Sequence, residues 1–108
     1  MIIRLPFPPA ELSPNNRHGK SWKSTIAAKK AQREAAFYAT KQAASGFIAP
    51  SGYIPLSLLF LTPDKRHRDL DNMLSSAKSA IDGMALALNI DDSRFKPVLI
   101  RLRVCACA

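Results

Sequence analysis

The chain has 108 residues, of which 47% are hydrophobic, so it is long enough for one domain with its own core and needs no disulfide framework. It carries 16 Lys and Arg residues against 8 Asp and Glu residues, a formal net charge of +8, which favours a polyanionic partner such as nucleic acid. We recognise neither a signal peptide nor an apolar run near the ~20 residues of a membrane span, so we expect a cytoplasmic protein with no membrane partner.

The first half of the chain predicts one strand and one long helix. Residues 1–6 are expected to form a short strand that ends at Pro6, and a loop rich in Pro, Asn and Gly follows up to residue 22. A helix rich in Ala, Lys and Gln then extends to Gly46, with Ser24 or Thr25 as its cap. The spacing of its apolar residues predicts a core-facing side made of Ile26, Ala27, Ala31, Ala35 and Tyr38.

The second half predicts two strands around another helix. Residues 53–62 are expected to be a strand that Pro63 ends, and 96–107 a final strand after a turn at 89–95. Between them, a helix over 71–88 carries an apolar stripe made of Met73, Leu74, Ala77, Ile81, Met84 and Leu88. The order β-α-β-α-β predicts an α+β (mixed α/β) fold, a single small domain over residues 1–108 with a mixed sheet packed with two helices.

The acidic residues are unevenly placed. Glu11 and Glu34 stand alone, whereas all the aspartates fall between residues 64 and 92: Asp64, Asp69, Asp71, Asp82, Asp91 and Asp92. Asp often caps helices and turns, which would account for two or three of them. Acids that serve solubility are usually scattered over a surface, whereas acids that hold a cation are gathered, so we favour a functional cluster.

The spacing of the aspartates suggests how they could converge. Residues two apart, such as Asp69 and Asp71, share a side of an extended chain but lie on nearly opposite sides of a helix. We therefore expect an extended chain at Asp69 and a helix that begins near Asp71 or Asn72. Within that helix, a polar stripe at i, i+4, i+7 and i+11 is made of Asp71, Ser75, Lys78 and Asp82. The alternative is a solvated helix face with a weak Lys78–Asp82 ion pair.

Acids and bases beside one another suit phosphodiester chemistry. Mg²⁺ prefers oxygen ligands, and a bound Mg²⁺ activates water and stabilises charge on a phosphodiester. Basic residues that could hold the DNA backbone precede the aspartates at Arg66 and Arg68, and an earlier loop carries Arg17, Lys20, Trp22 and Lys23. Trp22 could stack on an exposed base or could instead anchor the core. The pattern favours a metal-dependent nuclease.

These stretches resemble the signature of the RusA family of Holliday junction resolvases. The matching segments are RDLDN at 68–72, the helix with Lys78 and Asp82, and IDDSRF at 90–95, and LPFPPAELSPNNR at 5–17 is similar to the family's opening strand and loop. The resemblance implies an endodeoxyribonuclease that depends on Mg²⁺, with Mn²⁺ as a substitute. It also implies a homodimer that resolves four-way DNA junctions by symmetric paired nicks.

The resemblance further implies roles for individual residues. The family's acidic triad, which holds the metal, falls on Asp69, Asp71 and Asp92, and Lys78 is the candidate catalytic lysine that stabilises charge on the phosphate. The family lysine usually follows DLDN more closely, at the position of Ser75, so the alignment leaves Ser75 and Lys78 as alternatives. The expected contacts to the DNA backbone are Arg17, Lys20, Lys23, Arg66 and Arg68.

Two other functions remain open. A branched-DNA-binding protein without catalysis would bind DNA in a salt-dependent way but would not cleave it when Mg²⁺ is added. An RNA-binding accessory protein would prefer single-stranded or folded RNA. The chain lacks the aromatic RNP motifs of common RNA-binding modules, which argues against the RNA reading.

Overall fold

The computed structural model describes residues 1–13 and 22–104 of the chain. Within these ranges the main elements are α1 (Trp22–Ala43), β1 (Ile54–Thr62), α2 (Leu70–Ser76), α3 (Lys78–Leu88) and β2 (Phe95–Val104). Two short 3-10 helices, η1 (Ala10–Leu12) and η2 (Asp92–Arg94), precede α1 and β2. The expected small α+β fold is confirmed at this level. None of the described helices has both the length and the hydropathy that crossing a bilayer requires.

The sheet differs from the expected one. It has two strands, and β1 and β2 pair in parallel, with Leu56 opposite Val98 and Thr62 opposite Val104. Residues 1–9 form no strand, so the expected mixed sheet of three strands is not found in the described residues. Met1 and Ile2 are 60% and 82% exposed, and the segment continues into Pro6, Pro8 and Pro9, which lack an N–H group for a strand ladder.

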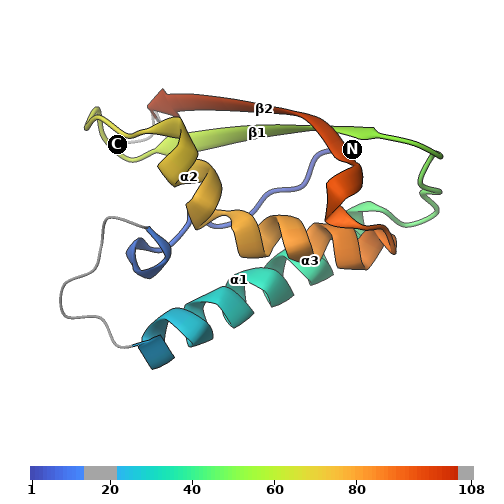
Figure 1. Ribbon diagram of the computed structural model, residues 1–108, viewed down its shortest axis with the longest axis horizontal. Helices are drawn as coiled ribbons and strands as arrows, with labels where there is room; N and C mark the ends of the chain where they lie inside the picture. Colours follow the sequence, from blue (N-terminus) through green and yellow to red (C-terminus); the bar gives the residue numbers. More distant parts are fainter. Residues whose placement is uncertain (14–21, 105–108) are drawn as a thin grey trace.

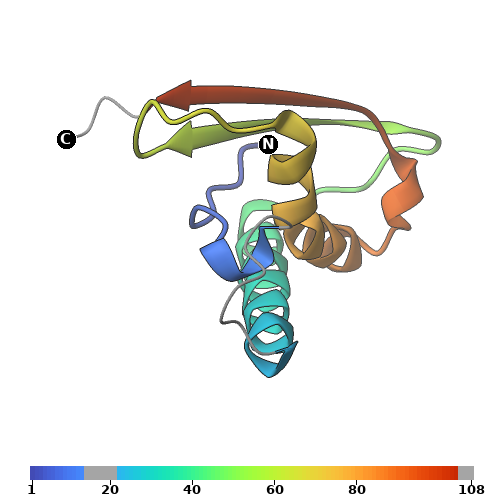
Figure 2. The same cartoon turned by 60° about the vertical axis from the view of Figure 1, so that its left-hand side comes forward.

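All three helices lie on one side of the sheet (Figure 1). α1 packs along α3, and the main core lies where these helices meet the sheet, with Ala36, Ile81, Met84 and Phe95 buried. Figure 2 shows the other side of the sheet bare of described elements. On that side Leu59 is 46% exposed and Leu99 is 53% exposed. The fold therefore has a single packed layer between helices and sheet.

The buried side of α1 is not the one that its apolar residues suggest. Ile26 and Tyr38 are 53% and 68% exposed, and the alanines expected beside them, Ala27, Ala31 and Ala35, are exposed too. The helix instead buries Ala36 and Thr40 completely. Because alanines occur all around this helix, apolar spacing does not single out one side, and the packing against α3 decides which side is buried.

The closest approach between α1 and α3 occurs at Gly83. A Cβ atom built on this glycine would overlap the backbone carbonyl oxygen of Arg33 and would lie 3.2 Å from the Cβ of Ala36. The missing side chain thus lets the α3 backbone rest directly on α1. This contact sets how closely the two helices approach each other.

The helix expected over 71–88 is interrupted at Ala77, where φ is −105° and ψ is 6°. The break leaves a carbonyl and an amide of the helix ladder without partners in their own helix. Gln32 of α1 supplies both: its Nε2 donates to the carbonyl of Ser76 at 2.9 Å, and its Oε1 accepts from the N–H of Ala80 at 3.0 Å. One side chain from another helix therefore stabilises the junction between α2 and α3.

Replacing Gln32 with leucine should lower the free energy of unfolding by about 1–3 kcal/mol, because two partly buried backbone groups lose their partners. Urea denaturation followed by circular dichroism measures the change. Gln42→Leu, on the exposed end of the same helix, is the matched control and should change stability little. Equal stability of the two variants would show that the Gln32 hydrogen bonds contribute nothing.

Candidate functional site

Asp69 lies where the backbone changes from extended to helical. It precedes α2 with φ −78° and ψ 137°, and the helix begins at Leu70, so the expected extended chain at this position is confirmed. Its carboxylate is 3.2 Å from Nε2 of His67 and accepts a 3.4 Å hydrogen bond from Asn72. Asp71 follows in the first turn of α2 with an exposed side chain. Both carboxylates are therefore accessible to a ligand.

Lys78 forms ion pairs with two acids, neither of which belongs to α2. Its Nζ is 3.2 Å from Asp82, one turn along α3, and 2.8 Å from Oδ2 of Asp92, which lies on η2. The Lys78–Asp82 ion pair, which belonged to the alternative of a solvated helix face, is thus present. The single polar stripe from Asp71 to Asp82 is wrong, because the break at Ala77 separates α2 from α3. Ser75, the alternative to Lys78, is exposed on α2.

The pairing changes the proton affinity of both partners. A hydrogen bond from Lys78 lowers the pKa of Asp92 below its ordinary value of 3.8. Hydrogen bonds to Asp92 and then to Asp82 raise the pKa of Lys78 above 10.5. Lys78 is therefore a cation at neutral pH, which suits the stabilisation of negative charge and not the abstraction of a proton.

These directions predict how the contact depends on pH. The lowered pKa of Asp92 stabilises the fold above pH 3.8, and this contribution is lost as pH falls through the lowered value. The raised pKa of Lys78 stabilises the fold below pH 10.5, and this contribution is lost as pH rises through the raised value. In an NMR titration of the Asp92 carboxyl carbon, Lys78→Met should move the midpoint up toward 3.8. An unchanged midpoint would show that the pair does not exist in solution.

Arg94 positions the loop that carries Asp92. Its Nε donates to the carbonyl of Gly52 at 2.9 Å, and its Nη2 donates to the carbonyl of Pro50. These bonds attach η2 to the turn before β1, so Asp92 is held at a fixed place beside α3. The role of Arg94 could not be predicted, because an arginine close to two aspartates in the sequence gives no signal of a backbone contact so far along the chain.

The expected DNA-contacting residues differ in their surroundings. Lys23 and Arg66 are exposed, whereas the side chain of Arg68 is only 12% exposed and forms a 3.0 Å ion pair with Asp64. Arg68 also donates to the carbonyls of Asp64 and Arg66 and lies over the ring of Phe7. The charge of Arg68 is thus largely neutralised by Asp64 within the same loop. Arg17 and Lys20 fall outside the described residues.

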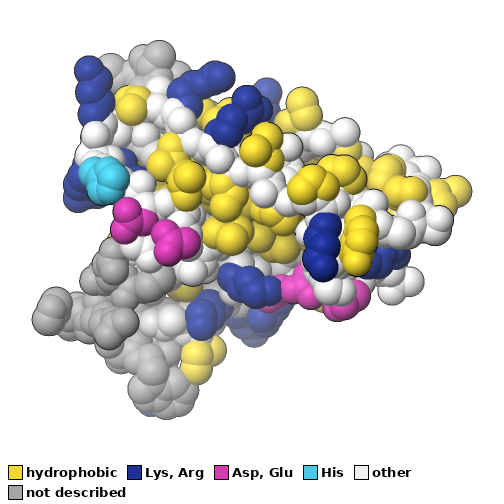
Figure 3. All heavy atoms as spheres, turned by 45° about the horizontal axis from the view of Figure 1, so that its top comes forward, with side chains coloured by type: hydrophobic (Ala, Val, Ile, Leu, Met, Phe, Trp, Pro, Cys, Tyr) yellow, Lys and Arg dark blue, Asp and Glu magenta, His cyan; other side chains and the backbone are white. Residues whose placement is uncertain are grey.

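The acidic side chains do not form one cluster. Figure 3 shows them in two places on one face, one beside a histidine and the other among Lys and Arg side chains. Within residues 1–13 and 22–104, no three His, Cys, Asp or Glu side chains form a group that could hold a metal ion. The metal-binding triad of Asp69, Asp71 and Asp92 stays a prediction.

The chain is similar to a bacterial protein of unassigned activity. It is 39% identical over 94 residues to an uncharacterised protein of Xylella fastidiosa (strain Temecula1), and the aligned part covers 86% of this chain and 61% of that protein. The chain therefore spans about three fifths of the relative's length. No family model matches the sequence. No solved structure matches the chain.

Proposed function

We propose that the protein is a Mg²⁺-dependent endodeoxyribonuclease that resolves four-way DNA junctions by paired nicks. The observation that carries the proposal is the 2.8 Å contact between Lys78 and Asp92, which lie 14 residues apart on different elements. Both belong to the stretches that resemble the RusA signature. Their contact supports Lys78, in preference to Ser75, as the lysine of that signature.

The donor set suits Mg²⁺ in its chemistry. Asp69 and Asp71 offer two exposed carboxylates at the start of α2, and Asp92 offers a third on η2. Mg²⁺ is commonly held by one or two carboxylates together with substrate phosphates and water, so a site of this kind does not require three protein ligands already in place. When bound, the ion would supply activation of a water molecule and neutralisation of phosphate charge.

The residues of the chain would then share the remaining work. Asp69 and Asp71 would bind the metal. Asp92 would give up its contact with Lys78 and bind the same metal. The freed ammonium of Lys78, which also pairs with Asp82, would stabilise charge on the phosphate. Arg66 and Lys23 would hold the DNA backbone. Two such sites, one in each subunit of a homodimer in the cytoplasm of a bacterial or phage-infected cell, would make the paired nicks.

A branched-DNA-binding protein without catalysis is the second candidate. The separation of the acidic side chains into two groups in the described residues favours it (Figure 3). Such a protein would use its excess of positive charge to bind phosphates, and its affinity would fall steeply with salt.

The deciding experiment incubates the purified protein with a labelled four-way junction or a linear duplex of the same sequence, in Mg²⁺ or in EDTA. The proposal expects paired nicks on the junction in Mg²⁺ and none on the duplex or in EDTA. Binding to the junction without nicks in Mg²⁺ or Mn²⁺ would overturn the nuclease proposal and favour the binding protein. Size-exclusion chromatography with light scattering tests the homodimer separately.

A further inference from the structure

A pocket lies where the two parallel strands end. Its wall includes Thr62 at the end of β1, Arg103 near the end of β2, and Asp64 to Arg66 in the loop that follows β1. In open parallel sheets, ligands commonly bind beyond the carboxyl ends of the strands. The pocket volume is about 110 Å³, well below the roughly 300 Å³ at which pockets for drug-sized ligands begin. It therefore suits a small group and not a whole nucleotide.

The pocket is strongly positive. Four of the residues that line it are cationic, Lys65, Arg66, Arg68 and Arg103, and one is acidic, Asp64. The backbone N–H of Arg66 and the guanidinium of Arg68 lower the pKa of Asp64, so this acid stays ionised and offsets Arg68. Lys65, Arg66 and Arg103 are exposed, and none of the ion pairs in the described residues involves them. Three cations at this edge of the sheet thus lack an acid partner within the described residues.

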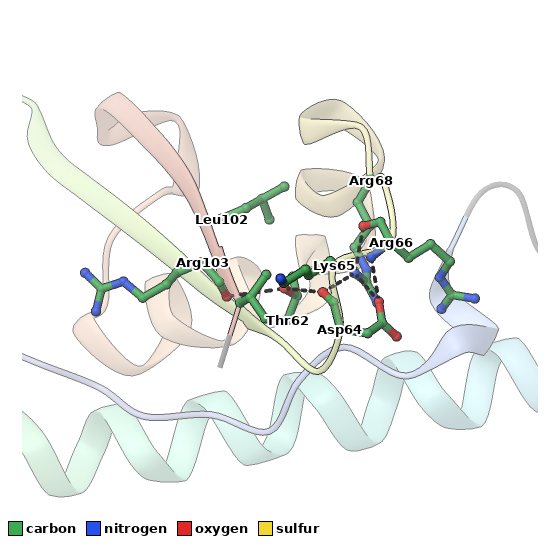
Figure 4. Close-up of a pocket in the computed structure, with 8 residues that line it drawn as sticks. Thr62, Asp64, Lys65, Arg66, Arg68, Leu102 and Arg103 are labelled. Atoms are coloured by element: carbon green, nitrogen blue, oxygen red, sulfur yellow. Dashed lines mark hydrogen bonds and ion pairs between the residues drawn. The ribbon is translucent and has the colours of Figure 1, made fainter. Parts of the chain in front are cut away.

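The arrangement of these three cations suggests the shape of their ligand. Figure 4 shows the side chains of Arg103 and Arg66 extending to opposite sides, with Lys65 between them, so the three do not point to one centre. Thr62, which is 4% exposed, ties the two sides together, because its hydroxyl shares its one proton between the carbonyl of Asp64 at 3.1 Å and that of Arg103 at 3.3 Å. A row of separated cations matches successive phosphates along a strand better than it matches a single anion.

We propose that Lys65, Arg66 and Arg103 form a track for the DNA backbone at the carboxyl ends of β1 and β2. This inference rests on the proposed function only in that its ligand is DNA. It adds Lys65 and Arg103 to the proposed DNA-contacting residues. It takes Arg68 out of that set, because Asp64 neutralises its charge within the loop. The track is separate from the contact between Lys78 and Asp92.

The test measures binding in EDTA, where no metal-dependent cleavage occurs. Fluorescence anisotropy with a labelled four-way junction gives the affinity between about 50 and 200 mM salt, and the slope of log K against log [salt] reports the number of phosphate contacts. Lys65→Gln, Arg66→Gln and Arg103→Gln should each reduce the slope by about 0.9, and the triple variant by about 2.7. Lys29→Gln, an exposed cation on α1, removes the same charge and should leave the slope unchanged.

The outcomes separate the two proposals. A wild-type slope for the triple variant, or an equal loss for Lys29→Gln, would overturn the track even if the protein cleaves junctions. Reduced slopes for the three track variants alone, in a protein that nicks no DNA in Mg²⁺, would support the track and overturn the nuclease. Reduced slopes together with junction-specific nicking would support both.

Discussion

Replacing Asp71 with asparagine should lower the rate of junction cleavage at least about 100-fold. The substitution keeps the shape of the side chain but removes the negative charge that binds the metal. The loss of metal-based stabilisation is worth several kcal/mol, and each 1.36 kcal/mol is tenfold in rate. Single-turnover cleavage of a labelled junction in saturating Mg²⁺ measures the effect.

The structure offers a matched control for this variant. Asp71 is exposed and so is Glu34 on α1, and Glu34→Gln removes the same charge from a residue that is not part of the candidate site. Glu34→Gln should cleave at the wild-type rate. Junction binding in EDTA should be equal or slightly tighter for both variants, since each loses one negative charge. A cleavage rate for Asp71→Asn within a few-fold of wild type would exclude Asp71 from the metal site.

Replacing Gly83 with alanine should destabilise the protein by at least about 3 kcal/mol, the upper part of the range for overpacked positions. In an ordinary helix alanine is more favourable than glycine by about 1 kcal/mol. The sign reverses here because the added Cβ would overlap the backbone carbonyl of Arg33, and backbone cannot rotate away as a side chain can. α1 and α3 would have to separate, which opens the main core.

Thermal unfolding followed by circular dichroism measures this second effect, and a loss of about 3 kcal/mol corresponds to a fall of roughly 10–20 °C in Tm. Leu86→Ala is the control on the same helix, because Leu86 is 62% exposed. It should change Tm by only a few degrees at most, about the effect of other surface substitutions. A Gly83→Ala protein as stable as wild type would show that the close approach of the two helices is not present in solution.

Strong local patterns in the sequence predicted their elements correctly. The apolar run that ends at Pro63 became β1, and the alternating segment before the C-terminus became β2. The stripe of Met73, Ile81 and Met84 is buried as expected, because large apolar residues at helical spacing leave only one side to bury. The same reasoning failed for α1, where alanine offers no contrast between sides.

Features that depend on distant contacts could not be predicted. Ala77 is a good helix former, and nothing near it in the sequence indicates an interruption, which is held by a glutamine on another helix. The contact between Lys78 and Asp82 follows from i, i+4 spacing, whereas the contact between Lys78 and Asp92 requires η2 to return beside α3. Helical periodicity predicts a residue's neighbours one turn away, but it does not predict where a later segment of the chain packs against the helix.

The interruption at Ala77 has a consequence for the geometry of the proposed nuclease site. Asp71 and Lys78 belong to two separate helices, so the distance between the Asp71 carboxylate and the Lys78 ammonium depends on the angle between α2 and α3. That angle is held by Gln32, which lies in the middle of α1 and contacts no candidate ligand or base. In the proposed nuclease, a substitution at Gln32 would change the distance between the carboxylates and the ammonium, and turnover would change while every residue of the candidate site is intact.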